Sequence, residues 1–110
     1  MTDRSRKYLS DIVSAIELIE EFLIGINDFQ IYQVDSKTRS AVERQLGIIG
    51  EAVNKVHQQG DHNLRQAQQI VQFRNRLIHA YDAVDDSIVW VIVKKHIPEL
   101  KQEAIKLLKE

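Results

Sequence analysis

The residues best suited to chemistry lie in one stretch of this 110-residue chain, between His62 and Tyr81. The stretch contains three arginines and no carboxylate, although the whole chain has a net charge of −1. Arg74 can bind phosphate, because its planar fork donates two parallel hydrogen bonds, and His79 can carry protons near neutral pH. These residue types indicate proton transfer beside a bound phosphate. On charge alone, a solvated helix face that happens to lack acids is an equally good interpretation.

The spacing of these residues decides which of them a single helix can bring together. Asn75 and His79 are four residues apart and share one face of an α-helix. Arg74 and His79 are five apart, about 140° round the helix axis, so one helix does not bring their side chains together well. A second copy of the helix, related by a two-fold axis, would supply the missing partner. Asn75 would either orient the imidazole or hold a phosphate oxygen.

The elements that must position this stretch are predicted to be helices. Apolar residues recur at steps of three and four from about Arg4 to Gly25. A short apolar linker, residues 29–34, follows, and Asp35 or Ser36 is a suitable N-cap for a second helix that ends near Gln58. The third helix is predicted to cover Leu64 to Tyr81 or Asp82, with Asp85 or Asp86 as the next N-cap.

The last segment, from Ile88 onward, is ambiguous. Its six apolar residues, Ile88–Val93, have the propensity of a strand, but no second strand is available to pair with it. We therefore predict a helix buried on most sides. Pro98 lacks an N–H and disfavours the α conformation at Ile97, so this helix should be kinked or broken there. The predicted fold is all-α: an antiparallel up-down bundle of four long helices, the fourth kinked or broken near Pro98.

Length and composition limit what else the chain can be. A chain of 110 residues is expected to form one domain, residues 1–110. The lack of cysteine excludes disulfides, thiol nucleophiles and cysteine-based metal sites. The longest apolar run is far too short for a membrane span, and the first residues do not form the apolar core of a signal peptide. We therefore expect a cytoplasmic protein without a membrane partner.

Other candidate site residues are weaker. His57 and His62, with Asp61 between them, have the types of metal ligands, but they straddle the turn at Gly60 and no fourth ligand is evident. We predict no metal site, and the chain has no Gly-rich phosphate loop, so we predict no cofactor. Glu51 is either a surface residue or a partner that fixes one of the arginines.

For two residues, Glu51 and Trp90, the sequence leaves alternatives open. For Glu51 we favour pairing with Arg74 or Arg76 over a role as a plain surface residue. For Trp90 we favour a core anchor over a platform on which a base would stack.

At this point the chain resembles a known family. Arg74-x4-His79 followed by Ala80-Tyr81 resembles the R-x4-H-x-Y motif of the HEPN superfamily, in its HepT-like branch. The segment Leu46-Gly47-Ile48-Ile49-Gly50-Glu51-Ala52 resembles the second-helix signature of this branch. The order Asp85, Trp90, Pro98, Leu100 resembles its last helix. The resemblance covers nearly the whole chain.

The resemblance implies a homodimeric helical toxin that cleaves RNA without a metal. It also implies a partner, a minimal nucleotidyltransferase antitoxin that adenylylates the tyrosine of the motif. By position, Arg74 and His79 would be catalytic, Asn75 and Arg76 would support them and bind phosphate, and Tyr81 would be the modification acceptor. We keep two alternatives: a non-catalytic helical partner that presents substrate or a tyrosine to a nucleotidyltransferase, and a plain dimerisation bundle.

Overall fold

The structure is a computed structural model that describes residues 1–60, 64, 70–73, 75 and 85–110. Within these residues all regular structure is helical. The elements are α1 (Asp3–Phe22), α2 (Phe29–Val34), α3 (Ser36–Gln58), α5 (Asp86–Val91), the π-helical turn η1 (Ile92–His96) and α6 (Ile97–Leu108). Residues 70–73 and 75 are also helical. The all-α prediction is confirmed for the described part of the chain, whereas most of the predicted third helix lies outside it.

The helix ends follow local capping chemistry. Asp35 caps α3, where its carboxylate accepts from the Thr38 N–H at 3.0 Å, and Asp85 caps α5 through the Ser87 N–H at 2.9 Å. Both caps were among those predicted. The segment predicted as a linker is instead the helix α2, because Asp28 accepts from the Ile31 N–H at 2.9 Å and starts a turn there. The chain after α1 turns at Gly25, whose φ is +83°.

The core lies where α1 and α3 face the C-terminal helices. The predicted stripe of the second helix is fully buried, and α1 and α6 add residues that are equally inaccessible (Val42, Leu46, Ile49, Val53, Val56, Leu9, Ile12, Ile16, Leu100, Ala104). In the helical turn of residues 70–73, Ile70 and Phe73 are buried in the same cluster. Truncating a buried Leu or Ile in such a core typically costs about 2–5 kcal/mol. The helices that must position the motif are therefore held by ordinary apolar packing.

The C-terminal segment is helical from Asp86 to Leu108, as predicted, but it is less buried than expected. Val89 is buried, whereas Val91 is half exposed, because only one side of α5 faces the core. Near Pro98 the helix is interrupted by a π turn, in which the Ile97 N–H donates to the Ile92 carbonyl five residues back. Proline has no N–H to continue the α ladder, so the hydrogen bonds change register without a turn of the chain.

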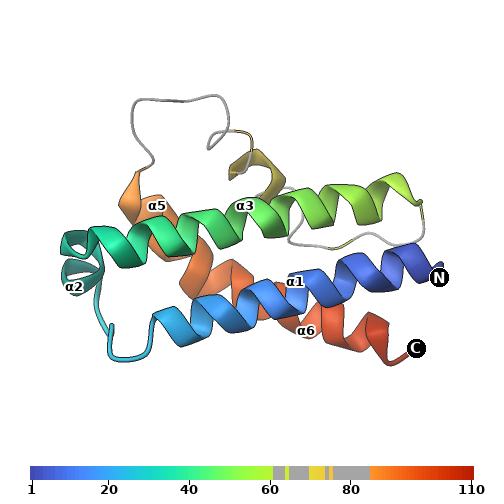
Figure 1. The fold of residues 1–110 in the computed structure, drawn as a ribbon, viewed down its shortest axis with the longest axis horizontal. Helices are drawn as coiled ribbons and strands as arrows, with labels where there is room; N and C mark the ends of the chain where they lie inside the picture. Colours follow the sequence, from blue (N-terminus) through green and yellow to red (C-terminus); the bar gives the residue numbers. More distant parts are fainter. Residues whose placement is uncertain (61–63, 65–69, 74, 76–84) are drawn as a thin grey trace.

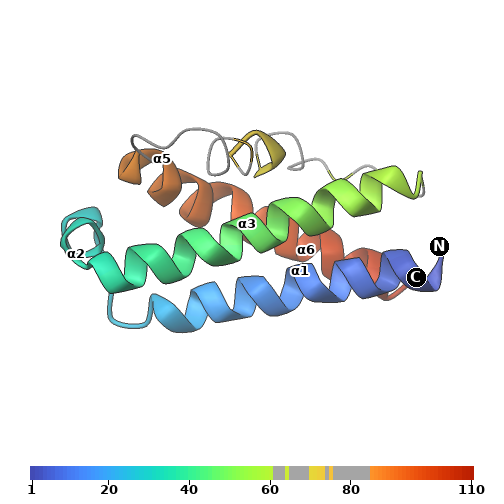
Figure 2. The ribbon, with the colours of Figure 1, turned by 45° about the horizontal axis from the view of Figure 1, so that its top comes forward.

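The helices form two layers. α1 and α3 lie side by side and run in opposite directions, and α5 and α6 lie behind them (Figures 1 and 2). Polar contacts between α1 and α6 include two that bridge the helices: Arg6 Nη1 donates to the Leu108 carbonyl at 3.1 Å, and Lys101 Nζ lies 2.8 Å from Glu20 Oε1. The helical turn of residues 70–73 lies beyond α3, on the side away from α1 (Figures 1 and 2). None of the described helices is long and apolar enough to cross a membrane.

Candidate active site

The predicted motif enters the described part of the chain at one residue, Asn75. Asn75 is helical and exposed, two residues beyond the buried Phe73. Two residues correspond to a rotation of about 200° round a helix, so Asn75 lies on the side of the helix opposite to the buried Phe73. The other predicted site residues, Arg74, Arg76, His79 and Tyr81, lie outside the described residues, and their grouping stays a prediction.

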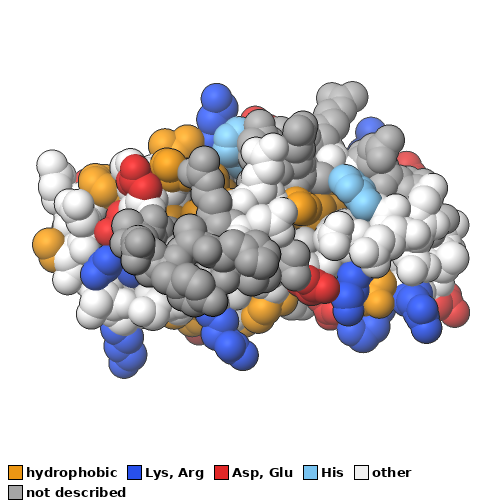
Figure 3. Space-filling view, turned by 90° about the horizontal axis from the view of Figure 1, so that it is seen from above, with side chains coloured by type: hydrophobic (Ala, Val, Ile, Leu, Met, Phe, Trp, Pro, Cys, Tyr) orange, Lys and Arg blue, Asp and Glu red, His pale blue; other side chains and the backbone are white. Residues whose placement is uncertain are grey.

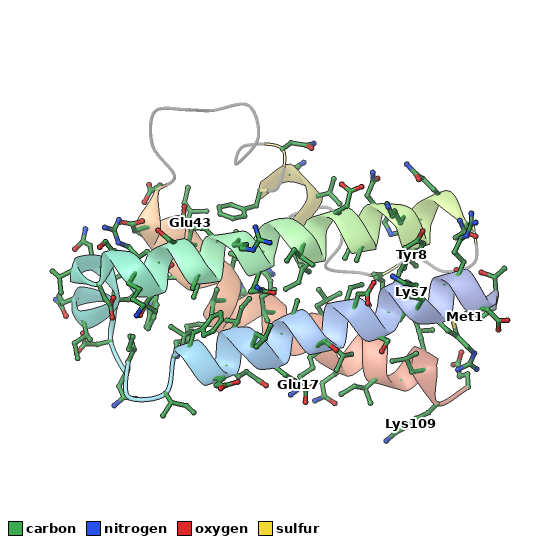
Figure 4. All side chains as sticks on the ribbon, viewed as in Figure 1. Met1, Lys7, Tyr8, Glu17, Glu43 and Lys109 are labelled. Atoms are coloured by element: carbon green, nitrogen blue, oxygen red, sulfur yellow. The ribbon has the colours of Figure 1, made fainter. Side chains whose placement is uncertain are left out.

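A groove lies between α1 and α3 on the described surface. It has a volume of about 690 Å³ and is lined by residues of both helices (Lys7, Tyr8, Asp11, Glu43, Arg44, Gly47, Ile48, Glu51, Ala52, Lys55). Figure 4 shows Lys7 and Tyr8 toward one end of the helix pair and Glu43 toward the other. Its surface is mostly apolar, although six of its lining side chains are charged. No sequence pattern predicted it, because it depends on how two helices pack.

Two lysines flank the aromatic ring at one end of this groove. The Nζ atoms of Lys7 and Lys55 lie 5.6 and 5.5 Å from the centroid of the Tyr8 ring, within cation–π distance. Lys7 also pairs with Asp11, 3.0 Å away on the next turn of α1. Glu51, half-buried in the groove wall, is the residue for which we predicted pairing with Arg74 or Arg76. Both arginines lie outside the described residues, so that pairing stays a prediction.

A polar cluster fixes the start of α5, the helix that follows the motif in the chain. Arg39 Nη1 lies 3.1 Å from Asp86 Oδ2, with the two side chains 30% and 18% exposed. Burial, followed by the charge of Asp86, raises the pKa of Glu43, and Arg39 opposes this shift. Burial also raises the pKa of Tyr32, whose ring is buried beneath the cluster. The cluster therefore depends on the Arg39 cation, which faces two carboxylates.

Trp90 occupies the aromatic junction of α2 and α5. Its ring centroid lies 5.3 Å from that of Tyr32 and 6.3 Å from that of Phe29, and the Lys94 ammonium lies 4.7 Å from the indole ring. The half-buried side chain packs against the core cluster. This packing confirms the prediction of a core anchor.

Of the residues considered as metal ligands, the structure describes His57 alone. His57 is exposed near the end of α3, and His62 lies outside the described residues. Within the described ranges, no group of three or more His, Cys, Asp or Glu side chains is placed to hold a metal ion.

Comparison with known proteins places this sequence in a family. The family model described as ribonuclease HepT-like matches residues 12–107. The chain belongs to the HepT-like family of the HEPN superfamily, as the resemblance predicted.

Several relatives are similar over nearly their whole length. A probable ribonuclease HepT of Thermococcus cleftensis is 44% identical over 109 residues, which cover 96% of this chain and 98% of that protein. A protein of Caldanaerobacter subterraneus, named as a candidate RNase, is 33% identical over 107 residues, 96% of this chain and 95% of the relative. A candidate RNase of Methanocaldococcus jannaschii is 32% identical over 111 residues, covering 96% and 91%. No solved structure gives a significant match.

Proposed function

We propose that this protein is a metal-independent endoribonuclease. One observation carries the proposal: a chain that belongs to the HepT-like family retains an uninterrupted Arg74-x4-His79-x-Tyr81 motif. The names of the relatives above, which describe ribonucleases, support the same activity. In the described structure, the helical residues just before and within the motif include a buried Ile70 and Phe73 and an exposed Asn75, which is compatible with this proposal.

The chemistry needs few groups, because RNA carries its own nucleophile. In the proposed reaction His79 accepts the proton of the 2′-hydroxyl while O2′ attacks the adjacent phosphorus. The bond from phosphorus to the 5′-oxygen breaks, and that oxygen takes up a proton from an imidazolium. Arg74 stabilises the negative charge that develops on the phosphoryl oxygens. The products are a 2′,3′-cyclic phosphate and a 5′-hydroxyl end.

The reaction needs a base and an acid in one turnover, whereas the motif supplies one histidine per chain. We infer that the protein acts as a symmetric homodimer in which Arg74 and His79 of both copies line one cleft. Asn75 and Arg76 would support the imidazole and bind phosphate there. We further infer that residues 64–81 form the helix that completes an up-down bundle of four long helices in a single domain, residues 1–110. The burial of Ile70 and Phe73 supports this arrangement.

We also propose how the activity is controlled. The resemblance implies a toxin–antitoxin pair in which a minimal nucleotidyltransferase adenylylates Tyr81. A nucleotide on this hydroxyl, two residues beyond His79, would place a bulky anion at the mouth of the cleft. Its charge would occupy the arginines that bind the scissile phosphate, and its volume would exclude RNA. The pair would operate in the cytoplasm, where RNA and the nucleotidyltransferase meet.

A non-catalytic helical partner of a nucleotidyltransferase remains the alternative, and substitutions separate the two functions. We expect His79→Ala and Arg74→Ala each to lower RNA cleavage by about 10²–10⁴-fold, the usual cost of removing a proton carrier or a phosphate-stabilising charge. Circular dichroism should show the helical fold unchanged. Cleavage by either variant at the wild-type rate, with contaminating nuclease excluded, would show that these residues are not the catalytic ones.

A further inference from the structure

The segment that carries the proposed catalytic motif is held at two points that the structure describes. At its start Ile70 and Phe73 are buried in the core, directly before Arg74. At its end Asp86 begins α5, five residues beyond Tyr81. Five residues span at most about 18 Å even when fully extended, so the place of Asp86 limits where the end of the motif can lie.

The hold at the end of this segment combines little burial with one ion pair. α5 has six residues, of which Val89 is buried and Trp90 half-buried, and a helix this short is not stable by itself. The pair of Arg39 and Asp86, 3.1 Å apart, ties its first turn to α3. α5 begins at the end of the molecule where α2 lies (Figures 1 and 2). Seen from above, acidic and basic side chains lie next to each other at this end (left in Figure 3).

Arg39 is turned into the junction of α2, α3 and α5. Its Nε atom is buried, as is the hydroxyl oxygen of Tyr32 on α2, and neither atom has a hydrogen-bond partner among the described residues. Its Nη1 atom is engaged by Asp86. An arginine that binds phosphate typically presents two parallel N–H groups to the ligand. The placement of this guanidinium therefore favours a role between helices over contact with RNA.

The carboxylates of the junction make this cation important for the place of α5. Glu43 lies one turn beyond Arg39 on α3, and burial and the charge of Asp86 raise its pKa. If the cation is removed, Asp86 faces Glu43 alone, and like charges in a partly buried site repel each other. The first turn of α5 can relieve this repulsion by moving away from α3. The end of the motif segment, which is joined to it, would then move as well.

We propose that Arg39 is a positioning residue for the proposed ribonuclease site: by holding Asp86 against α3, it fixes the segment that carries His79 and Tyr81. Catalytic groups must be held within a fraction of an ångström of the productive geometry, and a shift of about 1 Å can lower a rate by about 10²-fold. Arg39 acts through Asp86 and contacts neither RNA nor the reacting atoms. The inference rests on the proposed function and adds to it a residue outside the motif.

The chain offers a matched control for the loss of this ion pair. Lys101 on α6 lies 2.8 Å from Glu20 on α1, so this pair also joins two helices. It involves neither α3 nor α5. Arg39→Met and Lys101→Met each remove one cation from an interhelical ion pair, and they therefore change the net charge of the protein equally. Any general effect of stability or charge on RNA binding should be similar in the two variants.

Steady-state cleavage of a defined RNA separates positioning from binding. At a temperature well below the unfolding midpoints, we expect Arg39→Met to lower kcat by about tenfold and to change KM by less than about twofold. Asp86→Asn should lower kcat in the same way, although it removes a negative charge. Arg39→Lys, which keeps the cation, should recover most of kcat, and Lys101→Met should cleave like the wild type. If circular dichroism shows that Arg39→Met does not fold, Asp86→Asn takes its place.

Three results would overturn the proposal: an unchanged kcat in Arg39→Met, an equal loss in Lys101→Met, or a rise in KM without a fall in kcat. A wild type that does not cleave RNA would refute the ribonuclease, and hydrogen exchange then tests the junction alone. Amides of the peptide that covers α5 should exchange faster in Arg39→Met than in the wild type, but not in Lys101→Met. Equal exchange in all three proteins would refute the positioning role.

Discussion

The ion pair between Arg39 and Asp86 should contribute measurably to stability, because it ties α3 to the helix that follows the motif. The two groups are 3.1 Å apart and 30% and 18% exposed. They therefore fall between an exposed pair, worth about 0.2–1 kcal/mol, and a buried pair, whose disruption costs about 3–5 kcal/mol. Replacing Arg39 by Met keeps the apolar stem and leaves Asp86 and Glu43 without their cation. We expect a loss of about 1–2 kcal/mol, or about 4–8 °C in Tm.

The pH dependence of this loss has a definite sign. The folded-state pKa of Glu43 is already raised by burial and by Asp86, and Arg39 lowers it. Without Arg39, the Glu43 carboxyl binds its proton at a higher pH. Protonation removes the charge of Glu43 and so relieves its repulsion with Asp86. The loss caused by Arg39→Met should thus be largest at neutral pH and should shrink as the pH falls toward the ordinary value of 4.5 for Glu43.

Urea unfolding followed by circular dichroism measures these differences in a double-mutant cycle. Arg39→Met, Asp86→Asn and the double variant should show a coupling of about 1–2 kcal/mol at pH 7. Lys37→Met, a change at an exposed cation of the same helix, is the control and should stay within about 0.5 kcal/mol of the wild type. A coupling near zero, or a loss that grows on acidification, would refute the reasoning.

Two further predictions concern modification and acid stability. After incubation with the cognate nucleotidyltransferase, ATP and Mg²⁺, intact-mass spectrometry should show added AMP units on the wild type and none on Tyr81→Phe; equal modification of both would exclude this acceptor. The Ser87 hydroxyl and N–H lower the pKa of Asp85, so its stabilising effect is present above pH 3.8, its ordinary value, and is lost as the pH falls through the lower folded-state pKa. The urea midpoint of the wild type should therefore exceed that of Asp85→Asn at pH 7, and the difference should narrow as the pH falls below 3.8; a difference that stays constant would contradict this role of Asp85.

Helical periodicity predicted the main elements because each long helix buries one continuous stripe. The spacing from Val42 to Val56 requires an amphipathic helix, and the carboxylates of Asp35 and Asp85 mark where helices begin. Residues 29–34 were expected to be a linker because one and a half turns are too short to show a period. The exposed side of α5 was also missed, since a run of apolar residues does not reveal how many of its sides are covered.

The site was predictable only where its residues lie close together in the chain. The spacing from Arg74 to Tyr81 is a local motif, and the sequence displays it completely. Arg39 and Asp86 are 47 residues apart, and no periodicity links them. The groove around Ile48 likewise exists only after α1 and α3 have packed. Such features depend on the placement of helices relative to one another and have no local signature in the chain.

The assignment as a ribonuclease is tested most directly by mapping the ends of cleaved RNA. Purified protein that has not met a nucleotidyltransferase would be incubated with RNA in the presence of EDTA, beside His79→Ala prepared in the same way. We predict cleavage by the wild type with 2′,3′-cyclic phosphate and 5′-hydroxyl ends, and its loss in the variant. Intact RNA with the wild type, cleavage abolished by EDTA, or equal cleavage by both proteins would contradict the assignment.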